Sequence, residues 1–507
     1  MVQTLKSILS PHPDAALAIG ASDRDWLTYG GLRALADDVR EQLGQAGITA
    51  EDRVAIVLPN GACMATSFIT IAQSATTAPL NPGYREDEYA FYLEDLSAKA
   101  VVLEHGYEGP ALAAARTLSL NILWLHEDAK TAGHFTLKSD AATTPVTPRE
   151  TNPDDVALIL HTSGTTSRPK IVPLLQSNIA ASAKNIADSL GLRADDRCLN
   201  VMPLFHIHGL IAAVASSMSV GASIWCTSGF NAMTFFASMK EARPTWYTAV
   251  PTMHQAILMR ASRNADVIAE VPLRFIRSSS ASLPAQVMHS VQETFGAPVI
   301  EAYGMTEATH QMCCNPMGKQ KPGSVGLPAG PDVAIADEED NHLIEGSGEV
   351  VISGPNVTPG YESNEDANAK SFFDLDGKRW FRTGDKGNFD EEGFLYLTGR
   401  LKEIINRGGE KVSPLEVDGV LMDHPAIAQV VTFALPHSKL GEEVAAAIVL
   451  KDGETASEAD IRNFASERMA DFKVPRKVVI LDEIPKGATG KMQRIGMAEK
   501  LGLVEKA

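Results

Sequence analysis

The chain has 507 residues, of which 44% are hydrophobic and 21% charged, and 45 basic residues against 63 acidic ones give a formal net charge of −18. This composition excludes a collagen-like, coiled-coil or wholly disordered protein, and at roughly 150 residues per domain the length predicts about three domains or subdomains. The negative charge disfavours nucleic acid and anionic membrane surfaces as partners, because long-range repulsion opposes their approach.

The cysteines and the N-terminus indicate a cytoplasmic protein. Five cysteines without the spacing of a metal site are typical of reduced thiols, and the first residues contain no long apolar stretch of a signal peptide. Residues 54–84 and 209–239 lack Asp, Glu, Lys and Arg, but prolines interrupt the first stretch and Gly, Ser and Thr dilute the second. A membrane span needs about 20 predominantly apolar residues, so we expect buried core elements there and no span.

Helix and strand patterns alternate along the first half of the chain. Apolar residues recur at helical spacing from Leu32 to Leu43, and Gly47 ends that pattern. Short apolar strands are predicted at 54–58, 101–103, 157–160 and 299–300. Strands that alternate with helices predict a largely parallel sheet flanked by helices, so the fold class is α/β.

The pattern changes after residue 330. Short strands separated by Gly-rich turns are predicted at 349–353 and 393–397, and a small α/β unit follows from about residue 403. Its predicted elements are strands at 430–434 and 445–450 and a helix at 458–468. The charged segment 399–409 joins two regions with separate apolar patterns, so we place the domain boundary there.

A candidate phosphate loop, H-T-S-G-T-T-S-R-P-K at residues 161–170, follows directly on the strand that ends at 160. Its small hydroxyl residues and Gly164 allow backbone N–H groups to surround phosphate oxygens, and Lys170 supplies a compact cation. Pro169 stands where a Walker loop has its second glycine, so that loop type is excluded. Taken alone, the segment is either a phosphate loop or a Ser/Thr-rich surface turn.

The loop resembles the signature T-S-G-T-T-G-x-P-K of the adenylate-forming superfamily, which includes the acyl-CoA synthetases, with Ser167 in place of the usual glycine. Five more motifs of that superfamily follow in order: Y-G-M-T-E at 303–307, F-R-T-G-D at 381–385, G-R-L-K-E at 399–403, G-G-E-K-V-S at 408–413 and P-K-G-A-T-G-K at 485–491. The resemblance extends from about residue 28 to 494. Within the superfamily, segments 161–174, 204–209, 245–251, 278–282 and 307–310 are most similar to the oxalate–CoA ligase branch.

The resemblance implies a two-domain fold whose domains alternate between two poses. A large N-terminal AMP-binding domain, residues 1–398, would combine helix-flanked sheets with a small β-barrel-like part. A hinge at 399–402, with Lys402 as the hinge residue, would lead to a small mobile α/β C-terminal domain, residues 403–507. Rotation of that domain would let one site serve adenylation first and thioester formation second. Both a monomer and a homodimer remain open.

Acyl adenylation joins two anions, a carboxylate and the α-phosphate of ATP, so the site must supply cations and aligned donors. The resemblance implies that Lys491 reaches both anions and that Glu307 associates with Mg²⁺, helped by Thr162 or Thr306. It also places Tyr303 against adenine, Asp385 on the ribose hydroxyls and Arg400 on ribose or phosphate. The other positions implied for ATP and AMP are Ser163, Gly164, Thr165, Thr166, Lys170, Ser280, Ala281, Ser282, Gly304 and Met305, and those implied for the CoA channel are Gly408, Gly409 and Glu410.

The candidate acyl pocket is polar, with His206, His208, Ser280 and His310 at positions where a fatty-acid site would be apolar. A small dianion buried away from water needs several donors or cations, which such a cluster provides. The sequence therefore predicts an ATP-dependent ligase that joins a small carboxylic acid to CoA with release of AMP and pyrophosphate, and oxalate is the favoured acid. The alternatives are a CoA ligase for malonate or a short- or medium-chain fatty acid, an adenylating enzyme with an acceptor other than CoA, and an inactive binding protein on the same fold.

Overall fold

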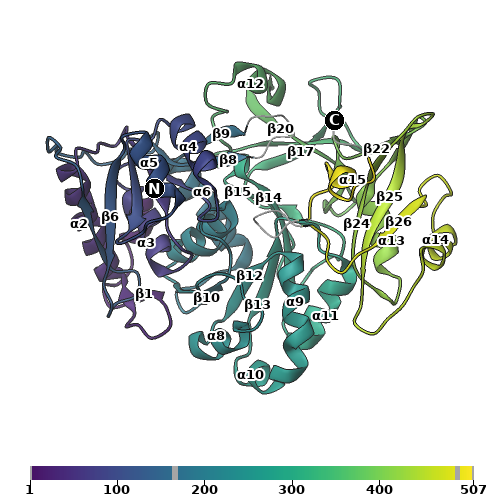
Figure 1. Cartoon of the computed structure of the whole chain (residues 1–507), viewed down its shortest axis with the longest axis horizontal. Coiled ribbons are helices and arrows are strands. Elements are labelled where there is room, and N and C mark those ends of the chain that lie inside the picture. Colours follow the sequence, from purple (N-terminus) through teal and green to yellow (C-terminus); the bar gives the residue numbers. More distant parts are fainter. Residues whose placement is uncertain (1–2, 163–168, 486–491, 505–507) are drawn as a thin grey trace.

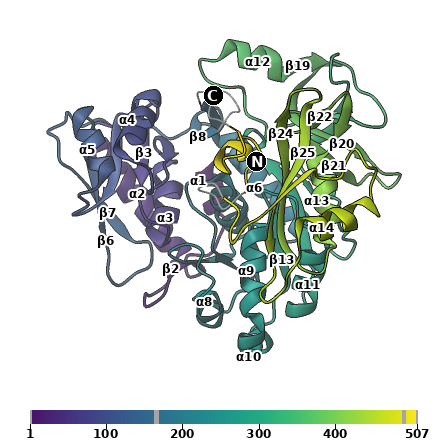
Figure 2. The same cartoon turned by 45° about the vertical axis from the view of Figure 1, so that its right-hand side comes forward.

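The computed structural model describes residues 3–162, 169–485 and 492–504 (Figure 1). Within these ranges the strands form four sheets, of seven, nine, five and five strands. The seven-stranded sheet and the C-terminal strands lie at opposite ends of the molecule in two views turned by 45° (Figures 1 and 2). The same part of the chain contains no helix that combines the length and the apolar character needed to cross a bilayer.

The seven-stranded sheet has the order β7-β6-β5-β3-β4-β8-β9, parallel in its centre and antiparallel at both edges. Its strands are β3 (Arg53–Val57), β4 (Thr76–Pro79), β5 (Ala100–Glu104), β6 (Asn121–Glu127), β7 (Phe135–Ser139), β8 (Val156–Thr162) and β9 (Lys170–Leu175), and its helices are α2 (Tyr29–Gln45), α3 (Ala62–Ile71), α4 (Glu86–Asp95) and α5 (Pro110–Thr117). Successive residues of β3 enter different cores: Val54 packs in the cluster with α2 and α3, and Ala55 in the cluster with α4 and α5. The sheet is therefore covered on both faces, as the alternating pattern predicts.

The nine-stranded sheet, of order β16-β15-β14-β13-β12-β10-β11-β1-β2, forms the second layer. Its strands are β1 (Leu17–Gly20), β2 (Leu27–Thr28), β10 (Arg197–Asn200), β11 (Ser223–Cys226), β12 (Trp246–Ala249), β13 (Phe275–Ser279), β14 (Val299–Met305), β15 (His310–Cys314) and β16 (Leu327–Pro328). Trp246 and Phe275 face the central core with α6 (Gln176–Leu190) and the π-helix η1 (His208–Ala215), while Tyr247 and Ile276 face α8 (Phe235–Ala242), α9 (Pro251–Ala261) and α11 (Ala285–Phe295). The central helices thus lie between the two large sheets.

The smaller elements complete these layers. They are α1 (Leu5–Leu9), α7 (Ser216–Ser219), α10 (Ala265–Glu270) and the 3₁₀ turns η2 (Ser262–Asn264) and η3 (Thr306–Ala308). The antiparallel β part that follows contains β17 (Asp332–Ala336), β18 (Gly348–Ser353), β19 (Phe372–Leu375), β20 (Lys378–Phe389) and β21 (Leu395–Arg400), with α12 (Glu365–Ser371). The strands predicted at 349–353 and 393–397 correspond to β18 and β21.

The C-terminal unit has a hydrophobic core of its own, which includes Ile405, Val417, Leu421 and Ile461. Its elements are β22 (Ile405–Arg407), β23 (Glu410–Val412), α13 (Pro414–Met422), β24 (Ile427–His437), β25 (Gly441–Leu450), α14 (Glu458–Ser466), β26 (Lys477–Ile480) and α15 (Met497–Lys500). The hinge predicted at 399–402 covers the last two residues of β21 and the two residues that follow it, before β22 begins at Ile405. The exact domain limits stay a prediction.

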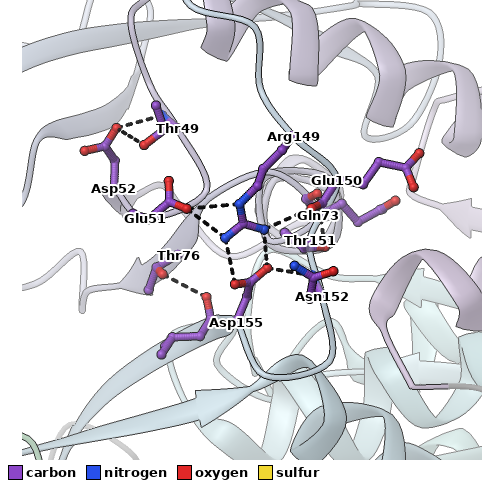
Figure 3. A network of polar contacts seen from close by, with 11 residues as sticks. Thr49, Glu51, Asp52, Gln73, Thr76, Arg149, Glu150, Thr151, Asn152 and Asp155 are labelled. Atoms are coloured by element: carbon purple, nitrogen blue, oxygen red, sulfur yellow. Dashed lines mark hydrogen bonds and ion pairs between the residues drawn. The ribbon is translucent and has the colours of Figure 1, made fainter.

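A network of polar contacts around Arg149 fastens the segment that leads into β8 (Figure 3). The guanidinium donates to Glu51 Oε1 at 2.7 and 3.0 Å and to the two carboxylate oxygens of Asp155 at 2.6 and 2.8 Å. Asp155 immediately precedes β8, and Asn152 donates its backbone N–H to the same carboxylate. These ion pairs are partly exposed, so each contributes little stability, but together they fix where β8 begins.

Candidate active site

The candidate phosphate loop connects β8 to β9 at the edge of the seven-stranded sheet. Thr162 ends β8, Lys170 begins β9, and the two residues are paired in the antiparallel ladder. The positions between them that we predict to bind phosphate, Ser163, Gly164, Thr165 and Thr166, lie outside the described residues, as does Ser167. The roles of these five residues stay predictions.

Glu307 and Lys170 both contact one tyrosine, Tyr361. The Tyr361 hydroxyl donates to Glu307 Oε1 at 2.9 Å, and Lys170 Nζ lies 4.0 Å from the centre of the Tyr361 ring. Glu307 belongs to the 3₁₀ turn η3 that follows β14 and is 6% exposed. Burial raises the pKa of Glu307 and lowers the pKa of Lys170. Tyr361 stands in no motif, which is why the sequence did not reveal it.

This arrangement fits a magnesium ion held together with phosphate oxygens. Mg²⁺ uses only one or two protein carboxylates and completes its shell with water and phosphate, so it needs no cluster of acidic side chains. The described residues contain no group of three or more His, Cys, Asp or Glu placed to hold a metal. Glu307, a buried carboxylate at the end of a strand beside a cation and close to Thr306, satisfies the simpler requirement.

Asp385 is held between Tyr303 and Arg400. The Tyr303 hydroxyl donates to Asp385 Oδ2 at 2.5 Å, and Arg400 Nε lies 3.2 Å from Asp385 Oδ1. Tyr303 and Asp385 are buried, and Asp385 pairs with Arg400 in the ladder between β20 and β21. The adjacent Asp385 raises the pKa of Arg400. Three residues that we predict to bind the nucleoside are therefore brought together, with a hydrogen bond from Tyr303 to Asp385 that the motifs did not suggest.

Gly304 is required by the close approach of β15 to β14. A Cβ atom at this position would lie 1.8 Å from the carbonyl oxygen of His310. The β14–β15 ladder shifts its register between Tyr303 and Gly304, directly before Met305 and Thr306. The glycine of the Y-G-M-T-E motif thus has a packing role that sets the position of His310.

The segment 280–283, which follows β13, contains the predicted nucleotide contacts Ser280, Ala281 and Ser282. It is attached to β14 because the backbone N–H of Leu283 donates to Glu301 Oε1 at 2.9 Å. Glu301 is buried, and burial raises its pKa to about 8. The carboxyl is therefore protonated at neutral pH.

Three of the four predicted acyl-pocket residues are joined by side-chain contacts, His208 with Ser280 and His208 with His310. His208 is the first residue of the π-helix η1 and is fully buried, and its Nδ1 lies 3.0 Å from Ser280 Oγ. The rings of His208 and His310 have centroids 4.9 Å apart in an edge-to-face arrangement. His206 is partly exposed and accepts the backbone N–H of His208 at Nδ1. Helices with π geometry are rare and are common at functional sites.

Backbone strain is concentrated at the same cluster. Ser280 has a φ of +74°, Thr309 of +48° and His310 of +98°, in the left-handed region that non-glycine residues rarely adopt. Each such residue costs about 1–3 kcal/mol and persists only where the surroundings impose it. Hydrogen bonds from Ser182 to the Thr309 carbonyl and from Thr309 to the Asn356 carbonyl fix the turn. The strain supports a functional role for this cluster.

Sequence reasoning missed three side chains that pack behind this cluster: Thr248 and Arg277, which contact His208, and Gln311, which contacts Arg277. Thr248 Oγ1 and Arg277 Nη1 lie 2.6 and 3.3 Å from His208 Nε2. Arg277 Nη2 donates to Gln311 Oε1 at 3.3 Å, and the whole Arg277 side chain is buried. Burial lowers the pKa of Arg277 to about 10, so it remains charged at neutral pH. The one signal in the sequence was a basic residue directly after the apolar pair Phe275 and Ile276.

The predicted hinge and CoA positions lie in the C-terminal unit and just before it. Lys402 is exposed between β21 and β22, and its charge contributes to the lowered pKa of Lys170. Gly408 and Gly409 adopt φ values of +62° and +99° in the turn between β22 and β23, and Glu410 is the first residue of β23. The predicted catalytic Lys491 lies outside the described residues, so its role stays a prediction.

The chain is similar to known proteins over almost its whole length. Residues 8–362 match the profile of the family described as AMP-binding enzyme, and residues 416–491 match that of the AMP-binding enzyme C-terminal domain. An oxalate–CoA ligase of Arabidopsis thaliana is 44% identical over 501 residues, which cover 97% of this chain and 96% of that protein. An oxalate–CoA ligase of Saccharomyces cerevisiae is 43% identical over 480 residues, covering 89% and 87%. The ATP-bound crystal structure of MatB from Rhodopseudomonas palustris superposes with a TM-score of 0.87 at 27% identity and covers 99% of both chains.

Proposed function

The chain belongs to the family of AMP-binding enzymes, and from this premise we propose that it activates oxalate with ATP and transfers the oxalyl group to CoA. In the first half-reaction a carboxylate oxygen of oxalate attacks the α-phosphorus of ATP, forms oxalyl-AMP and displaces pyrophosphate. In the second, the CoA sulfur attacks the activated carbonyl carbon, forms the thioester and releases AMP. The two relatives named oxalate–CoA ligase support this choice of acid.

The observation that carries the proposal is the contact of buried His208 and His310 with the partly exposed Ser280 through His208. A fatty-acid chain in such a pocket would bury polar groups without partners, which is unfavourable. A small diacid instead brings two carboxylates, one to react and one to accept hydrogen bonds from the Ser280 hydroxyl and the imidazole N–H groups. The pocket is therefore matched to a short acid with charge at both ends.

The nucleotide would be held by residues from both sides of the site. Asp385, positioned by Tyr303 and Arg400, would accept the ribose hydroxyls, and Lys170 would lie beside the phosphates. Glu307, with Thr162 or Thr306, would hold Mg²⁺, which neutralises phosphate charge when bound. Lys491 would contact the reacting carboxylate and the α-phosphate.

Pyrophosphate release across a panel of acids tests the choice of substrate. We expect oxalate to give a higher kcat/KM than malonate, acetate, butyrate and octanoate. A higher kcat/KM with octanoate would refute the argument from the polar pocket, and a higher value with malonate would reassign the enzyme to a longer diacid.

Mass spectrometry of the products tests the choice of acceptor. With ATP, oxalate and CoA present, we expect the CoA thioester to accumulate together with AMP. Free acyl-AMP that accumulates despite CoA would show that another molecule is the acceptor.

We also propose that the protein is cytoplasmic and keeps its thiols reduced. Its five cysteines are unpaired, and burial raises the pKa of four of them: Cys198, Cys226, Cys313 and Cys314.

A further inference from the structure

Arg277 is a fully buried cation for which the described residues provide no carboxylate partner. Its guanidinium donates hydrogen bonds to three uncharged acceptors: His208 Nε2 at 3.3 Å, Thr248 Oγ1 at 3.5 Å and Gln311 Oε1 at 3.3 Å. Its Nε has no hydrogen-bond partner in the same part of the chain. A buried charge without a counter-ion is costly, so an anion that enters the site would relieve that cost.

A nearby arginine shows the ordinary alternative. Arg274, immediately before β13, donates to both oxygens of the buried Asp196, at 3.0 and 2.7 Å. This pair is internally neutral and lies at the other end of the strand from the His208 cluster. Arg277, three residues further along, lies beside Thr248 in the β12–β13 ladder and on the sheet face that η1 covers. The two residues therefore differ in whether the protein itself supplies the negative charge.

The contacts of Arg277 also decide which tautomer His208 adopts. A guanidinium carries only N–H donors, so the His208 Nε2 that faces it must be an acceptor and carries no proton. The Thr248 hydroxyl can donate to the same nitrogen and accept from Arg277. The proton of a neutral imidazole then resides on Nδ1, which lies 3.0 Å from Ser280 Oγ. Protonation of Nε2 would place an N–H group against a cation.

Gln311 holds the other side of the guanidinium. Its Nε2 donates to Ser189 Oγ at 2.8 Å and to the Ala329 carbonyl at 3.2 Å, which leaves Oε1 directed at Arg277 Nη2. The amide is thereby fixed as an acceptor and not as a donor toward Arg277. The surrounding side chains thus retain the guanidinium in place without neutralising it.

We propose that Arg277 is a positioning residue that makes the acyl pocket selective for a dianion. It supplies the positive charge behind the pocket and holds His208 neutral, with its Nδ1 proton directed at Ser280 and the acid. His208 is then a fixed donor, and Arg277, not an imidazolium, is the cation. This inference rests on the proposed function, since it assumes that the acid bound at His208 and Ser280 carries two charges.

The test compares oxalate with oxamate, which has nearly the same shape but one charge fewer. Dissociation constants are measured by titration in the presence of Mg²⁺ and α,β-methylene-ATP, which prevents adenylation. For Arg277→Met we expect the dissociation constant of oxalate to rise roughly 10- to 100-fold and that of oxamate to change less than about threefold. The melting temperature of the variant should be unchanged or higher, because a buried uncompensated charge is removed.

Arg274→Met, immediately before the strand that holds Arg277, is the matched control. It leaves the buried Asp196 unpaired, so we expect a lower melting temperature and an unchanged ratio of oxalate to oxamate affinity. If Arg277 has only a structural role, Arg277→Met should behave like this control or weaken both acids equally. Either result would overturn the inference.

Arg277→Lys keeps the test decisive if the methionine variant does not fold. The titratable groups that face position 277 are His208 of η1, Cys198 of β10 and Cys314 of β15, with His310 beyond His208. Burial raises the pKa of both thiols, so they stay neutral. A buried lysine loses its proton more readily than arginine, so oxalate affinity should fall as pH rises in this variant while the parent is unchanged.

A flat pH dependence of oxalate affinity in Arg277→Lys, equal to that of the parent, would contradict the inference. The outcome is separable from that of the proposed function. If the parent protein does not prefer oxalate in the acid panel, the proposed function fails whatever the variants do. If the parent prefers oxalate and Arg277→Met retains its full discrimination against oxamate, the inference alone fails.

Discussion

Tyr303 donates a short hydrogen bond to Asp385 in a buried setting, and this hydrogen bond should matter for ATP more than for the acid. Replacing Tyr303 by Phe keeps the ring that we place against adenine and removes the donor that orients the carboxylate. We expect the KM for ATP to rise roughly 3- to 10-fold, as for the loss of one hydrogen bond, with kcat little changed. Steady-state kinetics with varied ATP at saturating acid measure this.

Tyr89→Phe is the control for that experiment. The Tyr89 hydroxyl donates to the Asn81 carbonyl at 2.8 Å in the outer layer of the N-terminal sheet, in a core that contains none of the predicted site residues. It should lower the free energy of unfolding by about 1 kcal/mol and leave the KM for ATP unchanged. A rise in KM for ATP of equal size in both variants would show that the effect of Tyr303→Phe is one of general stability.

Glu301 makes the stability of the protein depend on pH. Burial raises its folded-state pKa to about 8, above the ordinary value of 4.5. Below pH 4.5 the carboxyl is protonated in both the folded and the unfolded protein. As pH rises from there toward 8, the unfolded protein loses this proton while the folded protein keeps it, so the free energy of unfolding falls. Glu301→Gln keeps an oxygen for the Leu283 N–H but cannot ionise.

The variant should therefore gain stability relative to the parent between pH 5 and pH 9, by roughly 2–4 kcal/mol. Denaturant unfolding at the two pH values measures the difference, and subtraction of the two proteins isolates Glu301 from the other titrating groups. A stability difference that stays constant across this range would contradict the assigned protonation state.

At the residue scale, the sequence identified candidate site residues but not the side chains that contact them. His208, Ser280 and His310 stand in recognisable segments, and the structure brings them into contact. Arg277 and Tyr361 were missed because a single residue in a strand or outside a motif does not reveal which side chain it faces. Those contacts depend on the register between strands, which a single sequence does not display.

At the scale of elements, the turn between β14 and β15 is the most constrained part of the site. Its backbone combines Gly304, into which a Cβ cannot fit, with positive φ angles at Thr309 and His310. Gly304→Ala would push β15 away and shift His310. We expect a loss of about 1–3 kcal/mol in the free energy of unfolding and a higher KM for oxalate, measured by denaturant unfolding and steady-state kinetics.

Gly419→Ala is the opposite case and serves as the control. Gly419 lies inside α13, and a Cβ there would meet no atom within 4 Å. Alanine lowers the conformational entropy of the unfolded chain and favours the helix, so the variant should be about 0.5–1 kcal/mol more stable with unchanged kinetics. If the Gly304→Ala variant is as stable as the parent, β15 does not approach β14 as closely as described.

Elements with a clear period were predictable and the others were not. The helix expected up to Gly47 is α2, which Thr28 caps, and the helix expected at 458–468 is α14, which Ser457 caps. The strands at 430–434 and 445–450 form a longer hairpin, since β24 and β25 continue to the turn at Gly441. The π-helix η1 was not predicted, because residues 209–215 are apolar on every side and show no face.

For the whole molecule, net charge is a poor guide to the ligands. A chain of charge −18 is proposed to bind ATP and CoA, both polyanions. Residues 472–494 contain six basic residues against two acidic ones, an excess of 6 − 2 = 4. Lys473, Arg476 and Lys477 of this segment are paired with Glu416, Asp471 and Glu458, so most of the described excess is neutralised locally. Positive potential for the phosphates must come from individual residues such as Lys170.

We predict that the position of the C-terminal unit determines which half-reaction the site performs. Gln255 of α9 donates to the Ala428 carbonyl at 3.1 Å, and Gln286 of α11 donates to Asp423 at 2.8 Å, so the unit contacts those two helices.

Lys491→Ala removes the cation that we assign to adenylation. We expect oxalate-dependent pyrophosphate release to fall roughly 100- to 1,000-fold, with CoA transfer from preformed oxalyl-AMP affected much less.

Quenched, discontinuous assays on one preparation measure the rates of both half-reactions, and the melting temperature of the variant is the control for folding. Adenylation at the parent rate in Lys491→Ala would remove Lys491 from the reaction. An equal loss in both half-reactions would place it in a role common to the two poses of the C-terminal unit.

The central claim is that this enzyme joins oxalate to CoA, and the direct measurement is kcat/KM for CoA-thioester formation with oxalate, malonate and octanoate. The polar, strained contact of His208, Ser280 and His310 predicts the highest value with oxalate and the lowest with octanoate. A value for octanoate above that for oxalate would contradict it.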